Sequence, residues 1–92
     1  MKLLQFKASW CGPCKMQTKE FEENPVDAEL VAIDIDEDDN DLATQYDIRS
    51  IPTMILVGDN DEVINRWTGV TKSGTINEFI HGLRSTGTPK GE

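Results

Sequence analysis

The stretch of sequence that decides the fold runs Lys2-Leu3-Leu4-Gln5-Phe6-Lys7-Ala8-Ser9-Trp10-Cys11-Gly12-Pro13-Cys14-Lys15. Its first part, residues 2–6, is rich in apolar side chains and is typical of a β-strand. The Trp-Cys-Gly-Pro segment has the composition of a turn, and Pro13 suits the first position of a helix, where a missing N–H does no harm. The stretch therefore predicts a strand that leads directly into a helix, with Cys11 at the N-terminus of that helix.

The helix that begins near Pro13 is expected to run to Glu23, because Asn24-Pro25 is a stop signal. We expect Met16 and Phe21 to face the core. After this helix, β-branched side chains alternate with other residues, which predicts a strand over 29–35.

Further along the chain, an acidic turn leads into a short helix, and the most apolar stretch leads through a hairpin turn into another strand. A last amphipathic helix carries its apolar residues on one face. We expect the acidic turn and short helix at 36–46, the apolar strand at 51–57 and the hairpin turn at 58–61. The following strand is expected at 62–67 and the last helix at 75–83.

The resulting order, β-α-β-α-β-β-α, predicts an α/β fold in which a four-stranded mixed sheet is flanked by three helices, with helices on both faces. A chain of 92 residues is long enough for one domain. We expect this domain to span 1–85 and a flexible, Gly/Pro/Thr-rich C-terminal tail to span 86–92.

Composition excludes several classes of function. The chain carries 17 acidic and 9 basic residues, which gives a formal net charge of −8. Nucleic acids and anionic membranes both attract cationic surfaces, so we expect neither as a partner. The longest apolar run, 54–57, is too short to cross a bilayer, and residues 1–6 lack the features of a signal peptide. These observations favour a soluble, cytoplasmic protein, and we also expect it to be a monomer.

The two cysteines, Cys11 and Cys14, lie three positions apart. A disulfide across so short a loop stabilises a fold by about 2 kcal/mol, against about 4.7 kcal/mol for a loop of 100 residues. In a reducing compartment such a pair is more typical of catalysis or metal binding. At a helix N-terminus, unpaired N–H groups stabilise a Cys11 thiolate, and Cys14 lies one turn further on, within reach of a mixed disulfide at Cys11.

The six residues from Trp10 to Lys15 resemble the active-site motif of the thioredoxin family. The segment Ile48-Arg49-Ser50-Ile51-Pro52-Thr53 is similar to the cis-proline loop of that family, and Gly69 resembles a glycine beside the same groove. The order of elements matches from residue 1 to about residue 84. The N-terminal strand and helix of fuller thioredoxins have no counterpart, so the resemblance implies a thioredoxin fold trimmed to four strands.

The resemblance also implies a role for each matching residue. Cys11 would attack a substrate disulfide and Cys14 would resolve the mixed intermediate, which leaves a Cys11–Cys14 disulfide. Pro52, in the cis form, would present the Ile51 backbone to an extended substrate. The apolar rim that receives the substrate would consist of Trp10, Gly12, Pro13, Ile51 and Gly69.

The activity implied is that of a protein-disulfide reductase, which takes part in electron transport and cell redox homeostasis. No cofactor is required, because the redox chemistry takes place between sulfur atoms. Thioredoxin reductase is the implied source of electrons, and ribonucleotide reductase is an example of a disulfide-containing client.

Four positions depart from the family's pattern. Gln5 replaces a buried Asp that exchanges protons with the resolving thiol, and an amide is no general base near neutral pH. Ala32 replaces the lysine that often accompanies that Asp. Lys7 replaces a Trp, and a cation near Cys11 would favour its thiolate. Lys19 replaces a mid-helix proline. Gln5 and Lys7 are therefore expected to tune the acidity of the two thiols.

Other interpretations remain open. A structural zinc site needs four ligands, and beyond the cysteines the chain offers only His81, so we expect no metal. The acidic run 34–41 resembles a calcium loop, but Asp39 stands at the required glycine and Gln45 at the bidentate glutamate. We expect that run to be solvated and to disfavour acidic partners. A glutaredoxin-like electron donor and a non-enzymatic binding subunit of the same fold are the alternative functions.

Overall fold

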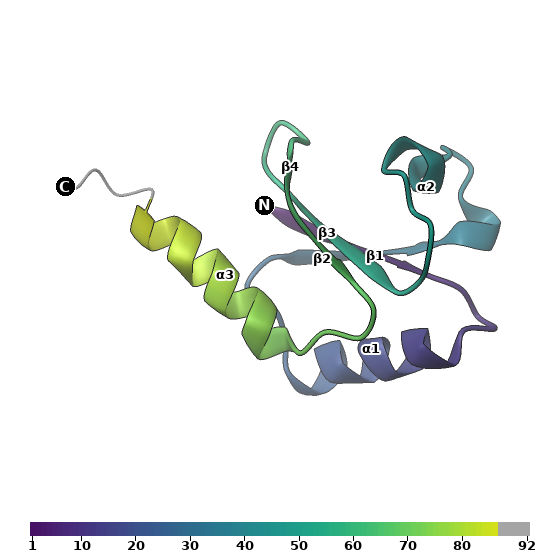
Figure 1. Cartoon of the computed structure of the whole chain (residues 1–92), viewed down its shortest axis with the longest axis horizontal. Coiled ribbons are helices and arrows are strands. Elements are labelled where there is room, and N and C mark those ends of the chain that lie inside the picture. The colour runs from purple at the N-terminus through teal and green to yellow at the C-terminus, as the bar shows by residue number, and fades with distance from the viewer. Residues whose placement is uncertain (87–92) are drawn as a thin grey trace.

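A computed structural model describes residues 1–86 of the chain (Figure 1). The order of elements agrees with the predicted one, with a short 3-10 turn, η1, added before the second helix. The elements are β1 (Lys2–Lys7), α1 (Gly12–Glu23), β2 (Glu29–Asp34), η1 (Ile35–Glu37), α2 (Leu42–Gln45), β3 (Thr53–Val57), β4 (Val63–Thr68) and α3 (Ser73–Thr86). Among the described residues, no helix is long and apolar enough to cross a membrane.

The four strands form one mixed sheet in the order β2-β1-β3-β4. Strand β1 is parallel to β2 and antiparallel to β3, and β4 is antiparallel to β3. The predicted fold class is thus confirmed. Because β1 lies inside the sheet, the loop that follows it leads from the middle of one end of the sheet into α1.

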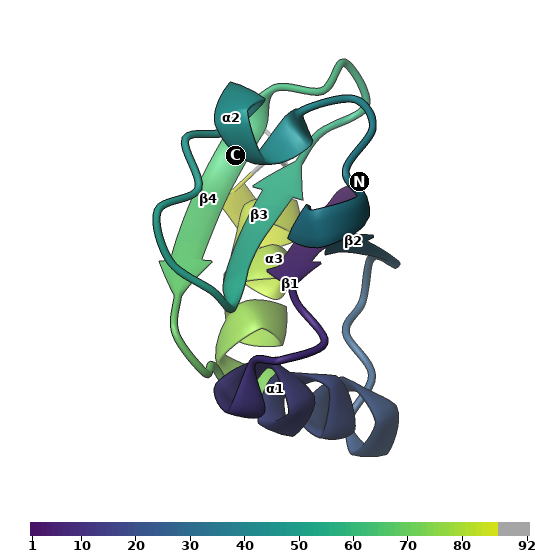
Figure 2. The same cartoon turned by 90° about the vertical axis from the view of Figure 1, so that its right-hand side faces the viewer.

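Helices cover both faces of the sheet, and Figure 2 shows α1 and α2 on opposite sides of it. Alternate residues of β1 and β3 supply the two cores. Leu3 and Leu56 pack with Phe21 of α1 and with the apolar face of α3. Phe6 and Val57, on the other face, pack with residues of α2.

Helix α1 buries one narrow face, formed by Cys14, Gln17 and Phe21. The prediction that Met16 faces the core is wrong, because Met16 is 63% exposed. Residues three or four apart share a face of a helix. Met16 and Phe21 are five apart, which places them on different faces, and the buried Phe21 fixes the orientation of the helix.

Most elements differ from the predicted bounds by one to three residues, and β3 and α3 differ most. Strand β3 begins at Thr53 rather than at residue 51, because Pro52 has no N–H for the ladder and Thr53 Oγ1 donates to Ser50 O (2.7 Å) in the preceding turn. Helix α3 is longer than the predicted 75–83 and reaches Thr86. The remainder of the predicted tail lies outside the described residues.

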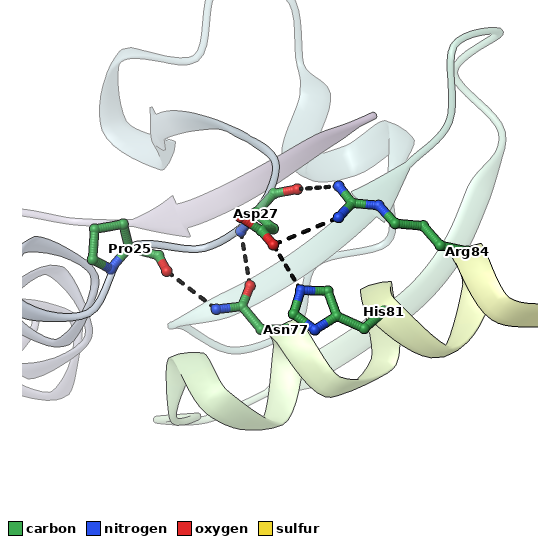
Figure 3. A network of polar contacts seen from close by, with 5 residues as sticks. All are labelled: Pro25, Asp27, Asn77, His81 and Arg84. Atoms are coloured by element: carbon green, nitrogen blue, oxygen red, sulfur yellow. Dashed lines mark hydrogen bonds and ion pairs between the residues drawn. The ribbon is translucent and has the colours of Figure 1, made fainter.

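Helix α3 is fixed to the loop between α1 and β2 by a polar network (Figure 3). The Asn77 side chain accepts a hydrogen bond from Asp27 N (2.7 Å) and donates to Pro25 O (3.1 Å). His81 Nε2 lies 2.6 Å from Asp27 Oδ2, and Arg84 also pairs with that carboxylate. The hydrogen bond with His81, together with the electrostatic attraction of His81 and Arg84, lowers the pKa of Asp27 below its usual 3.8.

Candidate functional site

The two cysteines form a disulfide at the start of α1, with their Cα atoms 5.2 Å apart. Cys11 is the N-cap residue, and its Sγ accepts a hydrogen bond of 3.1 Å from Cys14 N. Cys11 is 5% exposed and Cys14 1%, so Cys14 is the deeper of the two. A backbone N–H directed at Cys11 Sγ stabilises negative charge on that sulfur.

A second segment lies across from the cysteines. The Ile51–Pro52 peptide bond is cis, as the resemblance implied. The carbonyl oxygen of Ile51 lies 3.9 Å from Cys11 Sγ, and the Ile51 side chain packs against the cysteine pair. Pro52 is buried, so Ile51 is the residue of this segment that meets the solvent next to Cys11.

A third segment follows β4. Gly69 N donates a hydrogen bond of 2.8 Å to Pro52 O, which brings the end of β4 beside the proline turn. Gly69 adopts a φ of +86°, and no atom lies within 4 Å of where a Cβ would stand. A positive φ, rather than lack of space, therefore requires glycine here.

The predicted rim residues lie in the three segments that these contacts join. Trp10, at 67%, is the most exposed large apolar side chain among the described residues, and Val70 is 48% exposed. Gly12 and Pro13 are also exposed. The indole N–H of Trp10 donates a hydrogen bond of 2.8 Å to Asp36 Oδ2.

An apolar cavity of about 340 Å³ opens beside Trp10 and Ile51. The cavity is also lined by residues from η1, α2 and the loop before β3. Its remaining lining residues are Ile35, Ala43, Ile48, Arg49 and Ser50. Because Cys11 packs against Ile35 and Ile51, this cavity adjoins the sulfur pair.

The four departures from the family's pattern lie close together. Gln5 is buried, and its Nε2 donates to Thr18 Oγ1 (3.0 Å), one turn beyond Cys14. Ala32 is the direct partner of Gln5 on β2. Lys7 lines a cavity of about 550 Å³ with Cys14, Thr18 and Lys19, and Cys11 is not among the residues that line it. The lysine thus shares this cavity with the resolving position, whereas sequence reasoning expected it near Cys11.

The acidic run is engaged in local contacts. Asp34 Oδ1 accepts from Asp36 N (2.9 Å), and Asp38 Oδ2 accepts from Ala43 N (2.7 Å) at the start of α2. Within residues 1–86, no group of three or more His, Cys, Asp or Glu side chains is placed to hold a metal ion. His81 contacts Asp27 and lies on the last helix, outside the groove.

Sequence reasoning missed a polar connection next to the groove. Gln17 is fully buried and hydrogen-bonded to the backbone of Thr71, and Glu20 Oε2 accepts from Ser73 N (2.8 Å) at the start of α3. The only signal in the sequence is spacing, because Gln17 follows Cys14 by three residues on a helix.

A mixed sheet with a cysteine disulfide capping a helix, opposite a cis-proline turn, defines the class of α/β domains built around a paired-cysteine site. Within this class the chain belongs to the thioredoxin family, since the family model described as Thioredoxin matches residues 1–82.

Individual relatives agree with this assignment. A Staphylococcus epidermidis thioredoxin is 40% identical over a region that covers 68% of this chain and 64% of the relative. A Staphylococcus aureus thioredoxin is 39% identical with the same coverage. The chain thus spans less than two thirds of the length of these curated relatives.

Solved structures give the same fold. A mutant thioredoxin from Halobacterium salinarum superimposes with a TM-score of 0.75 at 31% identity, covering 88% of this chain and 72% of the other. A reduced thioredoxin pre-protein from Schistosoma mansoni superimposes with a TM-score of 0.73 at 30% identity, covering 88% and 76%.

Proposed function

We propose that this protein is a protein-disulfide reductase that works by dithiol–disulfide exchange between Cys11, Cys14 and a client disulfide. The observation that carries this proposal is the position of the sulfur pair. Cys11 caps α1, receives the Cys14 N–H at 3.1 Å and lies 3.9 Å from Ile51 O. A sulfur in this position is stabilised as a thiolate and faces a turn that an extended chain can approach.

In the first step, the Cys11 thiolate of the reduced protein attacks one sulfur of the client disulfide. The client S–S bond breaks, a mixed disulfide forms, and one client thiolate leaves. In the second step, the Cys14 thiolate attacks Cys11 Sγ and releases the second client thiolate. Two electrons pass to the client, and the Cys11–Cys14 disulfide is the oxidised product.

The second step requires that Cys14 lose its proton. Gln5, as an amide, accepts no proton near neutral pH, and its Nε2 already donates to Thr18. We propose that water in the cavity lined by Cys14 and Lys7 accepts the Cys14 proton. The ammonium group of Lys7 favours the anion that forms there.

The client would bind in the groove formed by the three segments described above. Its rim would consist of Trp10, Gly12, Pro13, Ile51 and Gly69, and the adjacent Pro52 is buried. The cavity beside Trp10 is suited to an apolar client side chain near the client cysteine. The net charge of −8 and the acidic run, whose Asp36 contacts Trp10, favour basic clients over acidic ones.

A disulfide product must be reduced again before the next cycle. Thioredoxin reductase is the proposed electron donor, and ribonucleotide reductase is a proposed client. We place this electron-transport cycle in the cytoplasm, where disulfides do not persist as structural bonds.

The test is reduction of insulin with NADPH and thioredoxin reductase, run beside a second assay with glutathione and glutathione reductase. We expect turnover in the first assay, and none for the Cys11→Ser variant. Preference for glutathione would favour a glutaredoxin-like electron donor. If neither assay shows turnover and the Cys11–Cys14 pair shows no reversible two-electron couple, the protein is instead a non-enzymatic binding subunit.

A further inference from the structure

Gln17 joins the helix of the cysteines to the loop that follows β4. Its Nε2 donates a hydrogen bond of 2.8 Å to Thr71 O, and its Oε1 accepts one of 2.7 Å from Thr71 N. The Gln17 side chain is completely buried. One amide group therefore satisfies both backbone polar groups of a residue 54 positions away.

The connection continues from Thr71 to the other side of the groove. Thr71 Oγ1 donates to Gly69 O at 3.0 Å, and Gly69 N donates to Pro52 O at 2.8 Å. The three segments that line the groove are thus linked in one hydrogen-bonded series that starts three residues from Cys14.

The loop at 69–71 lies outside regular secondary structure, between β4, which ends at Thr68, and α3, which begins at Ser73. Loss of the Gln17 amide would leave the N–H and C=O of Thr71 unpaired in a partly buried setting, which is unfavourable. The loop would then move to reach water, and Val70, 48% exposed at its centre, would move with it.

We propose that Gln17 is a positioning residue, which holds Gly69 and Val70 at a fixed distance from Cys11 and thereby sets the affinity for protein clients. This proposal rests on the proposed function. It concerns client binding rather than the exchange of sulfur bonds, because Gln17 contacts neither cysteine sulfur in any described hydrogen bond.

The main variant is Gln17→Leu, which keeps the size of the side chain and removes both amide contacts. Asn77→Leu is its matched control, because the Asn77 amide makes the same pair of contacts, to Asp27 N and Pro25 O, away from the groove (Figure 3). A purely structural role would give the two variants the same kinetic behaviour at similar losses of Tm.

Each variant is assayed with insulin and with dithiobis(nitrobenzoate), abbreviated here as dithionitrobenzoate, a small disulfide that does not fill the groove. For Gln17→Leu we expect KM for insulin to rise about tenfold, kcat to stay within twofold, and the dithionitrobenzoate rate constant to stay within twofold. For Asn77→Leu we expect all three values within twofold of the wild type. Equal losses on both substrates, or equal behaviour of the two variants, would overturn the proposal.

Thr71→Val, which removes only the contact to Gly69 O, serves as a second variant should Gln17→Leu fail to fold. It should raise KM for insulin in the same direction by a smaller factor. In the double variant, KM for insulin should rise by less than the product of the two single factors, because both substitutions act on one hydrogen-bonded series. If the two factors simply multiply, Gln17 and Thr71 act independently, which would contradict their linkage in one series.

Amide hydrogen exchange provides a readout that needs no activity. The Gly69 and Thr71 amides should exchange at least tenfold faster in Gln17→Leu and at the wild-type rate in Asn77→Leu. If the wild type reduces neither disulfide, the proposed function fails, yet the exchange rates still decide whether Gln17 positions the loop. Unchanged exchange at Gly69 and Thr71 would overturn the positioning role alone.

Discussion

Trp10 and Asp36 are joined by a hydrogen bond of 2.8 Å from the indole N–H to Oδ2, although the Trp10 side chain is 67% exposed. Asp36 is itself held in place, because its N–H donates to Asp34 Oδ1 (2.9 Å) at the end of β2. The indole, which lines the apolar cavity beside Ile51, is therefore held by a turn at the end of β2, 26 residues away in the sequence.

Replacement of Asp36 by Ala should release the indole and weaken client binding. An intramolecular hydrogen bond contributes about 0.5–1.5 kcal/mol, so we expect KM for insulin to rise about twofold to twelvefold. The indole N–H resonance of Trp10 in a ¹H–¹⁵N spectrum should shift and exchange faster with water. Glu37→Ala, one residue on, is the control. A Trp10 resonance unchanged in Asp36→Ala would argue against this contact in solution.

The two cysteines should differ in the intermediates that they allow. Cys14→Ser should accumulate a stable mixed disulfide between Cys11 and a client, because no second thiol resolves it. Cys11→Ser should form no such adduct, since the remaining Cys14 is only 1% exposed. Mass spectrometry after incubation with a disulfide peptide checks both results. An adduct on Cys14 at a rate similar to that on Cys11 would reverse the assigned roles.

A carboxylate at position 5 should accelerate the resolving step. Gln5→Asp places a proton acceptor beside Thr18, one turn from Cys14, where the amide accepts none. We expect the rate of mixed-disulfide resolution near pH 7 to rise several-fold, while the rate of the first attack stays within twofold. Stopped-flow measurement separates the two steps, and Gln5→Asn serves as the control. An unchanged second step would mean that Gln5 has no influence on that proton.

Short-range patterns predicted most of this fold. The alternation of apolar residues indicated the strands, and Pro13 and Asn24 marked the two ends of α1. The error at Met16 arose from spacing, since two apolar residues five positions apart share no helix face. The start of β3 was misplaced because the turn that ends at Pro52 depends on Thr53 contacting Ser50, not on apolar character.

The site was predictable only in part. The motif from Trp10 to Lys15 indicated the sulfur chemistry, and the resemblance supplied the opposite side of the groove. Contacts such as Gln17 to Thr71 depend on tertiary structure, and neither residue type signals its partner in the sequence. The cavity that Lys7 and Cys14 both line likewise depends on tertiary structure, because the two residues come from β1 and α1.

Gly69→Ala should destabilise the protein, although the added methyl group would clash with no other atom. A residue with a Cβ at φ +86° is strained, and the cost of left-handed backbone is about 1–2 kcal/mol. Urea unfolding should report that loss as a lower midpoint at an unchanged m-value. Gly12→Ala, also free of clashes but without a positive φ, is the control. Equal losses in the two variants would show that the φ at Gly69 is not the cause.

The polar network around Asp27 should stabilise the fold in a pH-dependent manner. His81, then Arg84, lowers the pKa of Asp27 in the folded state, so the stabilisation is complete above the unfolded value near 3.8 and is lost as pH falls through the folded value. Asp27→Asn should therefore be less stable than the wild type at pH 6, and the difference should shrink below pH 4. Urea unfolding at pH 6, 4 and 3 measures it, with Asp39→Asn as the control. A difference independent of pH would assign the effect to packing.

The proposed client groove consists of three pieces of chain, around residues 10–17, 51–52 and 69–71, that meet only in the complete fold. The sulfur pair, in contrast, lies within four consecutive residues and one helical turn. A partly unfolded chain would therefore keep a dithiol that reacts with any accessible disulfide, but it would lose the ability to choose among clients. Under the proposed function, the reactivity of the sulfur pair is therefore local, whereas selectivity among clients depends on the integrity of the whole domain.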